Sequence, residues 1–142
     1  MKFYSLFLIG LLAACEEPPP SHRFTVSGTV EFAQRFGRAT REWNDVCGLD
    51  LIVATYADAK GTYVFEVDNF GPRTMGRTSG PDEMKMIRIR HLDDEEFQVS
   101  VMAHEIGHSL GIDYHLPSGL MAEDWIDPVP RYVTPDLCNL VR

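Results

Sequence analysis

Apolar residues recur every three or four positions between residues 30 and 46, a spacing that places them on one face of an α-helix. The stripe consists of Phe32, Phe36, Ala39, Trp43 and Val46. Gly48 follows the stripe, and glycine often ends helices because it adopts a positive φ at no steric cost. The pattern predicts a helix from about residue 30 to 46 that packs its stripe into the core.

A second helical pattern covers residues 96–111. Its apolar positions are Phe97, Val101, Ile106 and Leu110. The acidic residues 93–95 precede it and supply an N-cap and negative charge for the first turn, where the helix dipole favours anions. Gly111 is well placed to end this helix.

Short runs rich in β-branched and aromatic residues predict strands. They cover residues 24–27, 49–55, 62–68 and 84–91, and a further short strand is expected at 73–78. The link 56–61 is only six residues long, whereas a parallel crossover usually takes a dozen or more. The strands on either side of this link are therefore expected to form a hairpin.

Three of the five histidines fall within residues 104–115. His104 and His108 lie four positions apart, so a helix presents both imidazoles on one face, as a tetrahedral zinc requires. Glu105 is adjacent, and from there a carboxylate can reach a metal-activated water without becoming a ligand. The turn at Gly111 allows His115 to approach the same metal.

The first residues have the pattern of an export signal. Lys2 precedes twelve apolar residues, 3–14, too few to span a bilayer as a helix, which needs about 20. Leu12-Ala13-Ala14-Cys15 looks like a bacterial lipobox. We expect a lipoprotein signal peptide at 1–14, a lipid anchor on Cys15 with a tether to residue 22, and an exported, membrane-anchored domain at 23–142. A plain secretory signal is the alternative.

Composition limits the remaining classes. A chain of 142 residues with 44% hydrophobic and 24% charged residues suits one globular domain. A net charge of −8 argues against a nucleic-acid partner, and we expect a monomer. With Cys15 used as an anchor, Cys47 and Cys138 either form one disulfide or remain unpaired, since spacing alone does not decide.

The motif residues resemble the metzincin clan of zinc peptidases, whose long motif is H-E-x-x-H-x-x-G-x-x-H followed by a Met-turn. His104, Glu105, His108 and Gly111 match it, and Ser118-Gly119-Leu120-Met121 looks like the Met-turn. The third ligand of the clan falls on Tyr114, one residue before His115. We prefer His115 because neutral imidazole suits zinc; Asp113, Tyr114 or an open position are the alternatives.

The resemblance implies an α+β fold, with a twisted mixed sheet of about four to five strands backed by two helices. It also implies a C-terminal helix from about 135, with Thr134 as N-cap and Pro135 at its first position. Met121 would form an apolar floor under the metal, and Trp125 would line a side-chain pocket. The strand at 73–78 would be the edge that pairs with an extended substrate.

The resemblance further implies a Zn²⁺-dependent endopeptidase acting on peptides or proteins, with Glu105 as general base and His104, His108 and His115 as ligands. One alternative is a non-catalytic, zinc-stabilised binding lipoprotein. Glu105 speaks against it, because a structural metal site needs no general base. The other alternative is an interaction lipoprotein that binds no metal.

Overall fold

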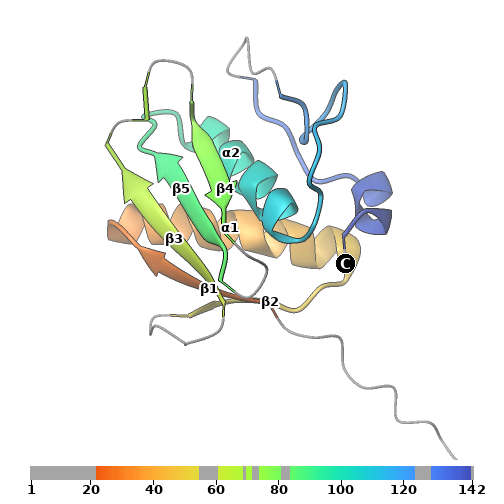
Figure 1. The fold of residues 1–142 in the computed structure, drawn as a ribbon, viewed down its shortest axis with the longest axis horizontal. Coiled ribbons are helices and arrows are strands. Elements are labelled where there is room, and N and C mark those ends of the chain that lie inside the picture. Colours follow the sequence, from red (N-terminus) through yellow and green to blue (C-terminus); the bar gives the residue numbers. More distant parts are fainter. Residues whose placement is uncertain are drawn as a thin grey trace, which may run out of the picture.

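The computed structural model describes residues 22–54, 61–68, 70–71, 74–80, 84–123 and 129–141. These residues form a five-stranded mixed sheet with two α-helices packed on one of its faces (Figure 1). The elements are β1 (His22–Ser27), α1 (Val30–Cys47), β2 (Leu51–Ala54), β3 (Thr62–Val67), β4 (Gly76–Ser79), β5 (Met86–Arg90), α2 (Glu95–Ser109) and the 3-10 helix η1 (Pro135–Asn139). The predicted α+β architecture is confirmed.

The predicted export signal and Cys15 lie outside the described residues. None of the helices in the described part of the chain has the length and hydrophobicity of a membrane span.

Helix α1 matches the predicted stripe, with a difference at its end. Thr29 caps the helix, because its hydroxyl accepts a hydrogen bond from the amide of Phe32 at 3.1 Å, and Gly48 ends it in the left-handed conformation with φ 65°. The first four residues of the stripe, from Phe32 to Trp43, are buried. Val46 is instead 36% exposed, because it lies at the margin of the stripe in the last turn of the helix.

The strand order is β2-β1-β3-β5-β4, with β4 antiparallel to β5 and the other pairs parallel. The predicted hairpin between β2 and β3 is wrong, because β1 lies between these two strands. The stagger of the strands explains the short link. Ala54 ends β2 opposite Thr25, and Thr62 begins β3 opposite Phe24. The connection therefore has to cross one strand and does not have to return along the sheet.

Strands β4 and β5 are shorter than their sequence patterns. β5 begins at Met86, so its buried residues Ile87 and Ile89 alternate regularly. The irregularity in the sequence arises because Met84 precedes the strand. The strand expected at 73–78 is observed as β4, Gly76–Ser79, at the edge of the sheet; residue 73 lies outside the described part.

Helix α2 is buried on nearly all sides, as is typical of a helix enclosed by other elements. It begins one residue earlier than predicted and ends two residues earlier, at Ser109. Asp94 caps it by accepting a hydrogen bond from the amide of Phe97 at 2.9 Å. The indole of Trp43 in α1 donates to the carbonyl of Ala103 at 2.9 Å, which joins the two helices at their buried contact.

The C-terminal segment differs from the expected α-helix. Residues Pro135–Asn139 form a 3-10 helix with Pro135 near its start, and the side chain of Thr134 makes no capping hydrogen bond. The amide of Leu137 instead bonds the carbonyl of Thr134, the three-residue spacing of a 3-10 turn. Cys138 forms a disulfide with Cys47, with Cα atoms 5.2 Å apart. Of the two alternatives for these cysteines, the paired one is observed.

Candidate metal centre

His104 and His108 point their Nε2 atoms at each other from consecutive turns of α2, 3.0 Å apart. Each ring is held by its other nitrogen. Nδ1 of His104 donates to the carbonyl of Leu120 at 2.7 Å, and Nδ1 of His108 donates to the carbonyl of Ile112 at 2.6 Å. With Nδ1 protonated, Nε2 keeps its lone pair for a metal.

His115 reaches the same point because the chain reverses after α2. Gly111 adopts φ 102°, and Nε2 of His115 lies 3.2 Å from Nε2 of His108. Two nitrogens bound tetrahedrally to one zinc are about 3.3 Å apart, given bonds of about 2.0–2.1 Å. The ligand atoms of the three histidines all lie within 4.8 Å of one another.

The cluster of potential ligands favours His115 over the aspartate at position 113. Among the described residues, the group of potential metal ligands contains the three histidines and not Asp113. The side chain of Tyr114 is 53% exposed. The structure thus brings together the predicted set His104, His108 and His115; their binding of a metal stays a prediction.

Burial keeps the two helical imidazoles neutral. It lowers the pKa of His104 to about 4, although the hydrogen bond to the carbonyl of Leu120 opposes the shift. Burial also lowers the pKa of His108, against a similar bond to Ile112. Neutral imidazole is the form that binds metal ions.

Glu105 is buried beside the histidines and is held by the edge strand β4. The hydroxyl of Thr78 donates to Oε2 of Glu105 at 2.6 Å and also approaches its backbone carbonyl at 3.1 Å. Burial raises the pKa of Glu105 to about 7, and the hydrogen bonds from Thr78 oppose that shift. A Cβ at Gly76 would lie 2.8 Å from the Glu105 side chain, so glycine leaves room for the carboxylate.

The sequence analysis assigned no role to Gly76 or Thr78. The signal for them is the two-residue period of a strand, which places positions 76 and 78 on one face. That this face meets Glu105 depends on the packing of β4 against α2.

The sequence analysis also assigned no role to Lys85. Its ammonium donates to the carbonyl of Ser109 at 3.0 Å and lies 3.5 Å from that of His108, which places a cation at the C-terminus of α2.

Met121 lies under the helix that carries the histidines. It is fully buried, and its sulfur lies 2.6 Å from the position that a Cβ on Gly107 would occupy. The turn that carries Met121 is closed by a 2.9 Å hydrogen bond from the amide of Leu116 to the Met121 carbonyl. The role of Met121 as an apolar floor under a metal stays a prediction. Trp125, the candidate pocket residue, lies outside the described residues.

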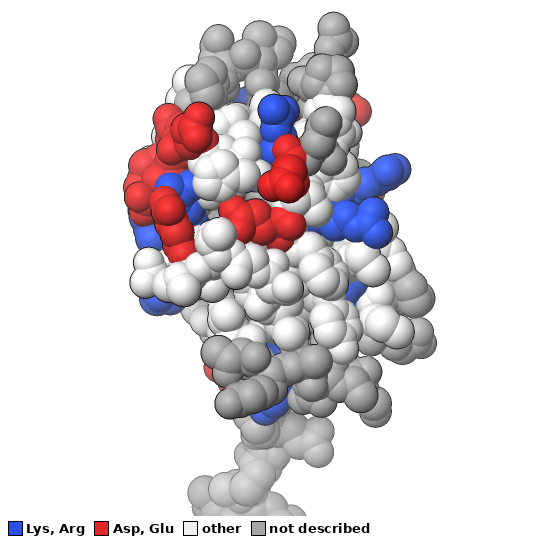
Figure 2. Space-filling model, turned by 90° about the vertical axis from the view of Figure 1, so that its left-hand side faces the viewer, with Lys and Arg blue, Asp and Glu red and all other residues white. Residues whose placement is uncertain are grey.

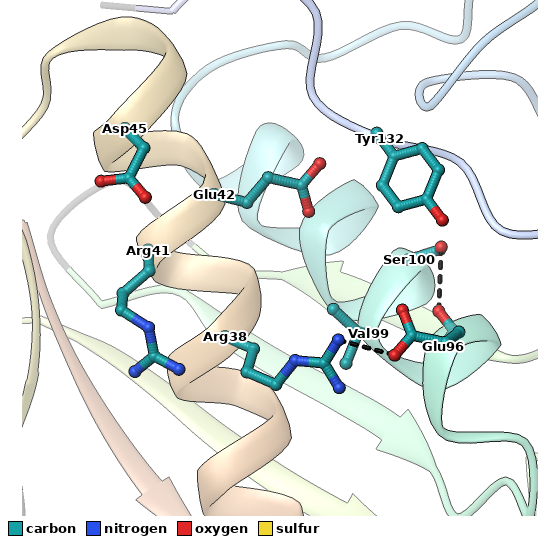
Figure 3. Close-up of a pocket in the computed structure, with 8 residues that line it drawn as sticks. All are labelled: Arg38, Arg41, Glu42, Asp45, Glu96, Val99, Ser100 and Tyr132. Carbon is teal, nitrogen blue, oxygen red and sulfur yellow. Dashed lines mark hydrogen bonds and ion pairs between the residues drawn. The ribbon is translucent and has the colours of Figure 1, made fainter.

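A separate hollow of about 310 Å³ lies between α1, the first half of α2 and the segment that carries Tyr132 (Figure 3). It is lined by Arg38, Arg41, Glu42, Asp45, Glu96, Val99, Ser100 and Tyr132. Its polar groups are largely engaged. Arg38 pairs with Glu96 at 2.6 Å, and Glu42 accepts from the amide of Val133 at 2.6 Å. None of the predicted site residues lines it.

Comparison with known proteins identifies the fold and no sequence family. No protein-family model matches the chain, and no curated protein sequence matches it. Among solved structures, the crystal structure of archaemetzincin from Methanopyrus kandleri matches with a TM-score of 0.50 and 11% sequence identity, covering 85% of this chain and 86% of that one. The chain therefore has an archaemetzincin-like α+β fold. Three of its histidines, His104, His108 and His115, could hold a metal ion.

Proposed function

We propose that this protein is a zinc-dependent endopeptidase. The observation that carries the proposal is the convergence of three imidazole Nε2 atoms beside a buried carboxylate. The archaemetzincin-like fold supports it at the level of architecture. A metal with a purely structural role would have no use for Glu105.

The donor set fits zinc. Three histidines are one of the ligand sets that leave a fourth position open in catalytic zinc sites, and both helical rings present Nε2 because their Nδ1 atoms are bonded to carbonyls. When bound, zinc would polarise a peptide carbonyl and make water more acidic.

Glu105 is the group that moves the proton. Thr78 occupies Oε2, which leaves Oε1 to accept a proton from the attacking water and pass it to the leaving amine. A carboxyl whose pKa burial raises to about 7 can both accept and release a proton near neutral pH. Among the described residues, β4 is an edge strand of the sheet. Its Gly76 and Thr78 contact this carboxylate, and an extended peptide would pair with this edge.

The decisive experiment compares the protein with a Glu105→Gln variant for zinc content and for cleavage of a mixed peptide library. We expect equal zinc per chain and a loss of turnover of about 10²–10⁴-fold, the usual contribution of a general base. Cleavage at the parental rate by the variant would refute the proposal. Retained zinc without cleavage by either protein would favour the non-catalytic alternative.

We further infer that the protein is exported and anchored by lipid on Cys15. The lipobox-like segment supports this inference, and so does the Cys47–Cys138 disulfide, since disulfides persist in oxidising compartments outside the cytosol. Mass spectrometry of the protein from a bacterial host should find a lipidated cysteine as the first residue. A Cys15→Ala variant should lack the lipid and be released from membranes washed with about 1 M salt, which screens electrostatic binding. An unmodified Cys15 would exclude the anchor.

A further inference from the structure

The face of the sheet opposite the helices carries an unusual set of side chains. Strand alternation places Phe24, Val64, Ile87 and Ile89 on the helix side, where they are buried. The neighbouring positions therefore face the other way. They include four arginines and two aromatic residues, which together we call the arginine face: Arg23, Arg77, Arg88, Arg90, Tyr63 and Phe65.

No acidic residue of the described strands belongs to this face. Glu66, the one acidic residue within these strands, lies on the helix side, where it accepts a hydrogen bond from the amide of Thr29 at 2.9 Å. The arginine face thus carries four arginine side chains in a chain whose net charge is −8.

Two of the arginines are neighbours on adjacent strands. Arg77 of β4 is the direct cross-strand partner of Arg88 of β5, and like charges at directly opposed positions destabilise a sheet. Within the described part of the chain, no carboxylate pairs with either guanidinium, and the side-chain contact of Arg88 is with the sulfur of Met86 at 3.2 Å. An anion bound at this face would relieve the repulsion.

Charge is unevenly distributed in Figure 2. Acidic side chains gather toward the left with basic side chains among them, and further basic side chains project at the right-hand margin. Because the strands lie in front of the helices in Figure 1, the arginine face is at the right in Figure 2. An extended anionic surface would attract this face more strongly than the helix side, where Arg38 is already paired with Glu95 and Glu96.

The aromatic residues suit a lipid headgroup layer. The rings of Tyr63 and Phe65 lie side by side on β3, with centroids 6.5 Å apart and planes at 16°, and both are partly exposed. Tyrosine accumulates at membrane interfaces, where its ring contacts apolar groups and its hydroxyl contacts water.

We propose that the arginine face docks onto a membrane that contains anionic phospholipid. This step goes beyond the proposed peptidase activity and needs no zinc. If Cys15 carries the lipid, residues 15–21 are seven residues that reach at most about 25 Å, at about 3.5 Å per residue. The sheet, which begins at His22, would then remain close to the bilayer.

Docking in this orientation leaves the histidine triad accessible. Gly76 and Thr78 of β4 point toward Glu105, whereas Arg77 between them points to the arginine face. The triad is therefore on the side of the sheet away from the bilayer. A flat surface would contact the arginine face alone. A long nucleic acid that wraps the molecule would also meet its acidic side, so we favour the membrane.

The test uses the full, processed protein on two kinds of vesicle: phosphatidylethanolamine with phosphatidylglycerol, or phosphatidylcholine alone. Exposed arginines are modified with phenylglyoxal and quantified by mass spectrometry. We expect Arg77, Arg88 and Arg90 to react at least about fivefold more slowly on the anionic vesicles, since each basic residue near such a surface contributes about a fivefold preference. Arg41, exposed on α1, is the internal control and should react equally on both.

A salt control and an Arg88→Gln variant test whether the protection is electrostatic. About 1 M salt, where the screening length is about 3 Å, should abolish the protection. Arg88→Gln should lower the protection of Arg90 about fivefold, and the matched Arg41→Gln should not change it.

Equal reactivity on both vesicles, or protection that 1 M salt leaves intact, would overturn the proposal. Protection by a DNA oligonucleotide but not by anionic vesicles would overturn it in favour of nucleic acid. Zinc content and peptide cleavage of the same samples report on the proposed function separately.

Discussion

At the scale of single residues, the candidate site depends on groups that hold its reactive side chains in place. Carbonyls of Leu120 and Ile112 orient two imidazoles, and the hydroxyl of Thr78 orients the carboxylate of Glu105. Such outer partners fix the tautomer of a ligand and the direction of a base, and their loss usually weakens metal binding or activity by about 10–100-fold.

The third ligand can be identified by a matched pair of neighbouring variants. His115→Ala should weaken zinc binding by about 100-fold or more, because it removes a ligand and not only a supporting group. Tyr114→Phe, which removes the hydroxyl of the exposed neighbour, should leave the affinity unchanged. Competition with a chromogenic chelator measures both. If Tyr114→Phe lost affinity and His115→Ala kept it, the ligand would be Tyr114.

Thr78 should act as a positioning residue for Glu105. Thr78→Val keeps the shape but removes the hydroxyl, and we expect kcat to fall about tenfold, the rate equivalent of one hydrogen bond of about 1.4 kcal/mol. Thr78→Ser retains the hydroxyl and should restore most of kcat. Zinc per chain should stay the same in both variants. Equal kcat for the valine and serine variants would show that the hydroxyl has no such role.

At the scale of elements, the position of α2 depends on a close contact with the Met-turn. A Cβ at Gly107 would lie 2.6 Å from the sulfur of Met121 and 3.2 Å from Trp43. Gly107, between the two helical histidines, therefore allows α2 to pack closely against Met121. It lowers the helix propensity by about 1 kcal/mol relative to alanine.

Gly107→Ala should lower the free energy of unfolding by about 1–3 kcal/mol, the usual penalty for overpacking a core. Gly37→Ala in α1 is the matched control. Its added Cβ meets only the Arg41 side chain at 3.7 Å, so the change should stabilise the protein by up to about 1 kcal/mol. Urea denaturation of both variants gives the comparison. A Gly107→Ala variant that is as stable as the Gly37→Ala variant would contradict the close contact.

At the scale of the whole molecule, the disulfide closes the chain on itself. It joins the last residue of α1 to η1 across 91 residues of sequence. A cross-link over so long a loop restricts the unfolded chain strongly. It also ties the C-terminal segment to the end of α1, next to the core that supports the site.

Replacing both cysteines, as Cys47→Ala with Cys138→Ala, should lower the free energy of unfolding by about 2–4 kcal/mol. Reducing agent should destabilise the parent by a similar amount and leave the double variant unchanged. Thermal denaturation with and without the reductant measures both effects. A parent that is insensitive to the reductant would show that the disulfide adds no stability.

Several features of the fold follow from local sequence alone. The stripe from Phe32 to Trp43 and the glycine at 48 define α1, because a helix makes its contacts between residues three or four apart. The same local geometry places His104 and His108 on one face of α2. Asp94 and Gly111, next to the ends of that helix, could also be identified from the sequence, since caps act within one turn.

Other features depend on contacts between residues that are far apart in the chain. The hairpin prediction failed because strand length and link length do not reveal that β1 lies between β2 and β3. The Thr78–Glu105 bond joins residues 27 positions apart. The pairing of Cys47 with Cys138 spans 91. No periodicity connects such residues, so their proximity appears only once the elements have packed.

The sequence by itself thus determined the two helices and the set of residues from which a metal site can be built, because both depend on spacing within one or two helical turns. The tertiary structure decided the rest. It set the order of the strands, brought His115 and Thr78 to the site and placed four arginines on one face of the sheet. These outcomes depend on which surfaces of distant elements pack together, and local spacing carries no information about that choice.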